Sequence, residues 1–146
     1  MAESWATIRP KAIAIWCVQF TEARLMKNVL IVDDSRSIRN EVTDVLTRAG
    51  YNVAEAADGA EALAYLSGPA SVSLVVLDVN MPGMNGLDVL DRIVNDHKAR
   101  NLPILMLTTE AERALVERAK KAGAKGWLLK PIKPELLVST VARLSL

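Results

Sequence analysis

The chain has 146 residues, and its 18 Lys and Arg against 17 Asp and Glu leave a net charge of +1. This balance gives no electrostatic reason to expect binding to nucleic acid or to an anionic membrane surface, which usually requires a basic patch. Cys17 is the only cysteine and His97 the only histidine, so a disulfide within the chain and a Cys- or His-based metal cluster are excluded. No apolar run approaches the roughly 20 residues that span a bilayer, and we therefore expect a cytoplasmic protein.

Residues 1–26 are predicted to be an N-terminal extension to a single domain over residues 27–146. Four apolar residues of the extension fall at i, i+3, i+4 and i+7, which is one face of a helix: Ile13, Trp16, Cys17 and Phe20. Three interpretations stay open. The extension is disordered, or it lies upstream of a true start at Met26, or it is an amphipathic helix that docks on the domain or on a partner.

From residue 27 onward, short apolar runs alternate with helical patterns. Residues 29–32 (Val-Leu-Ile-Val) are typical of a strand buried on both faces, and Ser35 is a candidate N-cap for the next helix. Gly50 is predicted to end that helix. Its predicted apolar stripe consists of Ile38, Val42, Val45, Leu46 and Ala49.

The same alternation continues to the last residues of the chain. Residues 51–54 are predicted to form a short strand, and Asp58 with Glu61 resembles a capping box for a helix that ends near Gly68. Further strands are predicted at residues 72–77, 104–107 and 127–129. Each of these strands is followed by a helix with an apolar stripe. The three stripes, in chain order, are Leu87, Leu90, Ile93 and Val94; then Ala111, Ala114, Leu115, Ala119 and Ala122, closed by Gly123; and last Leu137, Thr140, Val141 and Leu144.

Five strands alternating with five helices predict an α/β fold, a doubly wound parallel sheet with right-handed crossovers. Ligands of such sheets bind outside the carboxyl ends of the strands. The residues at those ends are Asp33, Asp34, Asp78, Thr108 and Lys130. Three carboxylates at one edge repel each other unless a cation separates them, and ligation by oxygen alone favours Mg2+ over a transition metal.

Lys130 and Thr108 suit a site that an anionic group visits. The carboxylate of Asp78 can attack a phosphoryl group to give an acyl phosphate. The transferred oxygens then require neutralisation by a metal ion, an ammonium group and a hydroxyl donor, which Mg2+, Lys130 and Thr108 would supply. Asn80, two residues after Asp78, can add its backbone carbonyl to the metal shell.

Four segments resemble those of response-regulator receiver domains in order and spacing, and the single-domain chemotaxis-type regulators are the most similar. The segments are residues 32–35 (Val-Asp-Asp-Ser), 77–86 (Leu-Asp-Val-Asn-Met-Pro-Gly-Met-Asn-Gly), 107–108 (Leu-Thr) and 130–131 (Lys-Pro). The resemblance covers residues 27–146. It implies a flavodoxin-like receiver fold with the strand order 2-1-3-4-5.

The resemblance also implies roles for individual residues. Asp78 would be the phosphoacceptor, with Thr108 and Lys130 contacting the phosphoryl group and a cis Lys130–Pro131 bond. The implied Mg2+ ligands are Asp33, Asp34, Asp78 and the carbonyl of Asn80. Thr108 and Trp127 would form the switch pair.

Three residues depart from the pattern of the family. Trp127 stands where relatives more often have Tyr or Phe, and either fixed core packing or a mobile switch fits it. Thr109 stands where relatives often have a smaller residue, which narrows the approach to the phosphoryl group. Ile132 replaces the usual Phe after Lys-Pro. The departures at Trp127 and Ile132 affect the expected binding of a partner and leave the expected phosphoryl-transfer chemistry unchanged.

The resemblance implies a signalling switch and no turnover enzyme. A histidine kinase would phosphorylate Asp78, slow self-catalysed hydrolysis would reverse the step, and the surface around the fourth helix, fifth strand and fifth helix would bind a protein target. A flagellar motor switch is the expected target, and a phosphate sink or a phosphorelay intermediate are the alternatives. An aspartyl-phosphate phosphatase of the haloacid-dehalogenase type is disfavoured, because its second aspartate is replaced by Asn80. A mononucleotide-binding domain is disfavoured because no glycine-rich loop follows the first strand.

Overall fold

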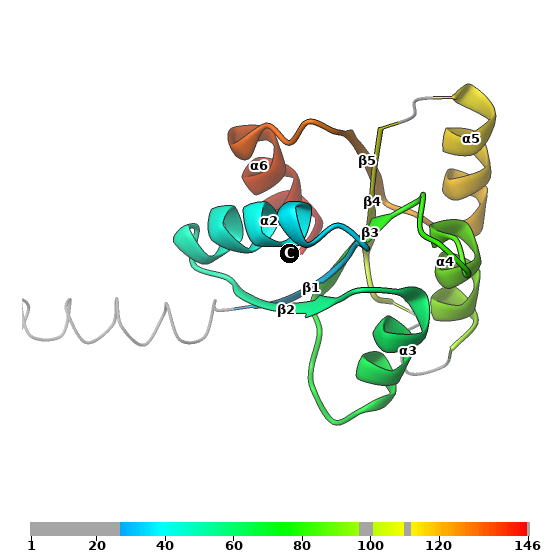
Figure 1. The fold of residues 1–146 in the computed structure, drawn as a ribbon, viewed down its shortest axis with the longest axis horizontal. Coiled ribbons are helices and arrows are strands. Elements are labelled where there is room, and N and C mark those ends of the chain that lie inside the picture. The colour runs from blue at the N-terminus through cyan, green and yellow to red at the C-terminus, as the bar shows by residue number, and fades with distance from the viewer. Residues whose placement is uncertain (1–26, 97–100, 110–111, 146) are drawn as a thin grey trace, which may run out of the picture.

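The computed structural model describes residues 27–96, 101–109 and 112–145 (Figure 1). Its parallel sheet has five strands in the order β2-β1-β3-β4-β5, which confirms the predicted fold and strand order. The strands are β1 (Asn28–Val32), β2 (Asn52–Ala56), β3 (Leu74–Asp78), β4 (Ile104–Thr108) and β5 (Gly126–Leu129). The helices are α2 (Arg36–Arg48), α3 (Gly59–Ser67), α4 (Gly86–Asn95), α5 (Arg113–Ala122) and α6 (Pro134–Leu144). The N-terminal extension, for which three interpretations stayed open, lies outside the described residues, as does His97.

The helices cover the sheet from both sides. Figure 1 shows α2 and α6 on one face and α3, α4 and α5 on the other. Successive residues of a strand point to opposite faces, so Leu30 and Val32 of β1 pack toward α3, α4 and α5, whereas Val29 and Ile31 pack toward α2 and α6. Every residue of β3 and β4 is buried, which explains why these segments read as continuous apolar runs.

Helix capping follows the sequence closely. The Ser35 side chain accepts a hydrogen bond from the N–H of Ile38, and Asp58 accepts one from the N–H of Glu61 at 2.8 Å. The Glu61 carboxylate accepts a bond from the N–H of Ala57, one residue earlier than in an ideal capping box. Gly50 ends α2 with a φ of 97°, a conformation that side chains with a Cβ rarely adopt.

Two predicted strand boundaries were wrong because pairing with β1 decides where its neighbours begin and end. The strand predicted at residues 51–54 is β2, which runs to Ala56 because Ala56 pairs with Val32. The strand predicted at residues 72–77 begins at Leu74, the partner of Val29. Within the described part of the chain, no helix is long and apolar enough to cross a membrane.

The apolar stripe predicted for α5 was only partly correct. Ala119 is the single buried residue of this helix, Leu115 is half-buried, and Ala114 is exposed. Ala111, which was also expected in the stripe, lies outside the described residues. The helix therefore rests on the sheet over a much smaller area than its periodicity suggests.

Candidate functional site

Three carboxylates meet at the carboxyl edge of the sheet. Asp33 and Asp34 follow β1, and Asp78 is the last residue of the neighbouring strand β3. Each offers a carboxylate oxygen within 4.8 Å of the others. Asp33 and Asp78 are buried, whereas Asp34 is exposed to solvent. This cluster could hold a metal ion through hard oxygen ligands.

Asp33 is held from several directions. One carboxylate oxygen accepts a hydrogen bond from the N–H of Ser35 at 2.9 Å, and the other accepts one from Nζ of Lys130 at 2.7 Å. The backbone N–H of Asp33 donates to the carbonyl of Ala56 on β2. Its own carbonyl accepts from the guanidinium of Arg39 at 2.6 Å. Arg39 was not among the predicted site residues, because a contact to a backbone carbonyl leaves no pattern in the sequence.

Lys130 links two of the carboxylates. Its Nζ lies 2.7 Å from Asp33 and 3.3 Å from Asp78. A hydrogen bond from its backbone N–H to the carbonyl of Thr108 fixes the residue at the end of β5, and the bond to Pro131 is cis, as predicted. Burial opposes the charged form of the ammonium, but the hydrogen bond to Asp33 and the charges of both carboxylates outweigh it and raise the pKa of Lys130.

The surroundings of Asp78 disfavour the ionised form of its carboxyl group. Burial and the neighbouring charge of Asp33 raise its pKa from 3.8 to about 6, although Lys130 acts in the opposite direction. Three ionised carboxylates facing one ammonium leave two negative charges in a largely buried space. A divalent cation bound among these oxygens would balance them, so the donor set fits Mg2+ by charge as well as by ligand type.

Two further predicted residues lie next to this cluster. Thr108 is fully buried at the end of β4, one position beyond Leu107, which is in register with Asp78. The N–H of Asn80 points to Asp78, whose Oδ1 accepts a long hydrogen bond of 3.4 Å. The roles predicted for Thr108 and Asn80 stay predictions.

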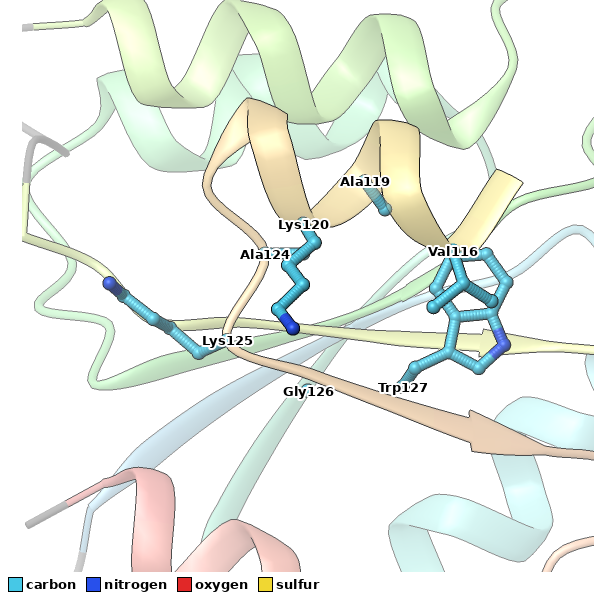
Figure 2. A pocket seen from close by; sticks show the side chains of 7 residues that line it. All are labelled: Val116, Ala119, Lys120, Ala124, Lys125, Gly126 and Trp127. Atoms are coloured by element: carbon cyan, nitrogen blue, oxygen red, sulfur yellow. The ribbon is translucent and has the colours of Figure 1, made fainter. Parts of the chain in front are cut away.

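Trp127 lies one strand away, beside a cavity of about 250 Å3 between α5 and β5 (Figure 2). Figure 2 shows Trp127 of β5 and Val116 of α5, which both line this cavity. The indole nitrogen is buried and has no hydrogen-bond partner within the described residues. The cavity is lined by Val116, Ala119, Lys120, Ala124, Lys125, Gly126 and Trp127. The indole therefore borders unfilled space, which a fully packed core residue would not do.

The chain is similar to known proteins over most of its length. The family model described as "Response regulator receiver domain" matches residues 29–142. The chemotaxis protein CheY1 of Helicobacter pylori is 40% identical over 110 residues, which are 75% of this chain and 89% of that protein. CheY-3 of Vibrio cholerae is 43% identical over 113 residues, covering 75% and 86% of the two chains.

A solved structure agrees with these relatives. The chemotaxis protein CheY4 of Vibrio cholerae superimposes with a TM-score of 0.78 and 44% identity, over 82% of this chain and 98% of that one. The residues that the family model matches include the acidic cluster of Asp33, Asp34 and Asp78. The chain belongs to the response regulator receiver domain family and is related to chemotaxis proteins of the CheY type.

Proposed function

We propose that this protein is a chemotaxis-type response regulator of the cytoplasm. A histidine kinase phosphorylates Asp78, and the α5–β5–α6 surface then changes its affinity for a protein target. One observation carries the proposal: the buried carboxylate of Asp78 ends a central strand, touches Lys130, and shares a cation-sized space with Asp33 and Asp34. Similarity to chemotaxis proteins supports a flagellar motor switch as the target.

In the transfer step, a carboxylate oxygen of Asp78 attacks the phosphorus atom. A P–O bond forms, the P–N bond to the kinase histidine breaks, and the leaving imidazole takes up a proton. Lys130 and the N–H of Asn80 both point to Oδ1, which leaves the other oxygen as the nucleophile. At neutral pH, a group with a pKa of about 6 is mostly ionised and can attack.

The residues around Asp78 would stabilise the transferred group. Asp33, Asp34, Asp78 and the carbonyl of Asn80 would hold Mg2+, which when bound neutralises charge on the phosphoryl oxygens. Lys130, already 3.3 Å from Asp78, would move its ammonium onto a phosphoryl oxygen. The hydroxyl of Thr108 would donate to another, and the residue would shift toward the site.

That shift would reach the partner surface through β5. Thr108 is in register with Leu129, two residues after Trp127 on the same strand face. Leu129 and Leu136 are the exposed large hydrophobic residues in the described part of the chain, 49% and 47% accessible, and they lie on β5 and α6. A rotation of Trp127 into the adjacent cavity would change this apolar surface and so its affinity for a target.

The assignment of Asp78 is tested by incubating the protein with acetyl phosphate and Mg2+. Mass spectrometry should detect one added group of about 80 Da, which hydroxylamine removes because the product is an acyl phosphate. Asp78→Asn should stay unlabelled. Asp44→Asn, which changes an exposed carboxylate on α2, is the matched control and should label like the wild type. Labelling of Asp78→Asn at the wild-type level would disprove the proposal.

A further inference from the structure

Arg39, on the first turns of α2, reaches the backbone of the acidic cluster. Its Nη1 donates a hydrogen bond of 2.6 Å to the carbonyl of Asp33, and its side chain is only 15% exposed. That carbonyl belongs to the planar peptide that joins Asp33 to Asp34. A short, charge-assisted hydrogen bond to the carbonyl fixes the orientation of this peptide, and with it the position from which the Asp34 side chain extends.

Asp34 depends on this peptide for its placement. Its side chain is exposed, and among the described residues no hydrogen bond or ion pair holds it. Asp33 differs, because Lys130 and the N–H of Ser35 hold its carboxylate directly. The backbone on both sides of Asp34 therefore sets where its carboxylate lies, and on the N-terminal side Arg39 holds the peptide through the carbonyl of Asp33.

A second contact orients the guanidinium of Arg39. Its Nε lies 3.2 Å from a carboxylate oxygen of Glu55 on the edge strand β2. Glu55 is in register with Ile31 of β1, two residues before Asp33. The planar guanidinium can donate to both acceptors at once in a fixed geometry, which a lysine ammonium cannot reproduce. Arg39 thus connects α2, β2 and the loop that carries the two aspartates.

We propose that Arg39 is a positioning residue of the metal site, which orders the Asp33–Asp34 peptide so that Asp34 is preset to bind a divalent cation. This inference rests on the proposed function, since it assumes that Asp34 is a Mg2+ ligand. Charge alone gives the opposite expectation: Arg39 is a cation, so removing it should tighten Mg2+ binding. The direction of the change in affinity therefore separates positioning from simple electrostatics.

The experiment is calorimetric titration of the full chain with Mg2+. Arg39→Met should weaken binding about tenfold, the usual loss when a residue that supports a metal ligand is removed. Arg36→Met is the matched control, because it removes a positive charge from the same helix without touching the carbonyl of Asp33, and it should bind at least as tightly as the wild type. Arg39→Lys keeps the charge but not the double contact, and its affinity should lie between the two.

Phosphorylation provides a readout that a purely structural role would not move. At low Mg2+ concentration, Arg39→Met should be labelled by acetyl phosphate more slowly than the wild type. At saturating Mg2+ its rate should recover, since only the affinity for the ion has changed. Thermal unfolding of each variant checks that the fold is retained, and Arg39→Lys carries the test if Arg39→Met does not fold.

Two results would overturn the inference, and they are distinguishable. If Asp34→Ala weakens Mg2+ binding but Arg39→Met and Arg39→Lys bind as tightly as the wild type, Arg39 has no positioning role and the proposed function stands. If Asp34→Ala leaves Mg2+ affinity unchanged, the ion binds elsewhere, and the proposed metal site fails together with the inference.

Discussion

The neighbouring helices α4 and α5 lie on the same face of the sheet and are attached to it very differently (Figure 1). Both have ten residues. The buried residues of α4 are Gly86, Leu87, Val89, Leu90 and Ile93. By contrast, α5 buries only Ala119 and borders the cavity next to Trp127. One helix is part of the core, and the other rests on it.

The N-terminus of α4 also lies close to the end of β3, the strand that ends in Asp78. The side chain of Asn85 caps the helix, and the N–H of Gly86 donates to the carbonyl of Val79. A Cβ atom at Gly86 would lie 2.0 Å from the carbonyl oxygen of Asp78, so only glycine permits this close approach. Among the residues that the structure describes, no side chain caps the start of α5. The end of β3 is thus packed closely against α4, while the surface proposed for partner binding includes α5, a helix with far fewer buried residues.

The largest expected effect is the stability difference between these two helices. Leu90→Ala removes a fully buried side chain of α4 and should lower the free energy of unfolding by about 3 kcal/mol. Leu115→Ala removes a half-buried side chain of α5 and should cost about 1 kcal/mol, because less apolar area is lost. Urea denaturation of both variants measures the difference. Equal losses would mean that α5 is as firmly packed as α4.

The contrast between α4 and α5 also separates features that could be predicted from the sequence from features that could not. Continuous apolar runs and capping residues predicted the sheet, and strand ends predicted which carboxylates would meet. The apolar stripe of α5 has the period of a helix, but its alanine side chains are too short to fill the space between α5 and β5. The period of a stripe carries no information on how far a helix lies from the sheet. Arg39 and Glu55 were missed for another reason, since they are 16 residues apart and one of the two contacts involves a backbone carbonyl.

A second prediction concerns Asp78, which lies close to the N-terminus of α4. Asp78 has a pKa of about 6 in the folded protein against 3.8 in the unfolded chain, so its ionisation favours unfolding. The cost is absent below about pH 4, grows as the pH rises to about 6, and is complete above that, where it is roughly 2–3 kcal/mol. In EDTA at pH 7, Asp78→Asn should therefore be more stable than the wild type by about 2 kcal/mol.

The control for this prediction is the exposed Asp91→Asn on α4, which should change stability by less than about 0.5 kcal/mol. The advantage of Asp78→Asn should shrink toward pH 4, because the wild-type carboxyl group is then protonated in the folded protein and only about half ionised in the unfolded chain. It should also shrink in saturating Mg2+, which binds the folded wild type. An advantage that does not depend on pH between 4 and 7 would contradict the assigned cause.

The smallest expected effect is a change in the fluorescence of Trp127. The proteins to compare start at Met26, so that Trp5 and Trp16 are absent and Trp127 is the only tryptophan. None of the predicted site residues precedes Lys27, and the shortened chain should fold and be phosphorylated like the full one. Phosphorylation should draw Thr108 toward the phosphoryl oxygens and let the indole enter the cavity of about 250 Å3 beside it. Acetyl phosphate with Mg2+ should then shift the emission beyond any shift caused by Mg2+ alone.

Size is the physical obstacle to this rotation, because an indole requires more room than the phenol ring of a tyrosine and packed interiors resist even one added methylene. The loose attachment of α5 reduces that resistance, since Ala119 is its only buried residue and the space next to Trp127 is already open. The shift should vanish in Asp78→Asn and become smaller in Thr108→Ala, which still accepts the phosphoryl group but lacks the hydroxyl that moves. If the emission stays constant in a sample that mass spectrometry shows to be phosphorylated, Trp127 keeps one rotamer, and α5 must carry the signal by moving as a whole.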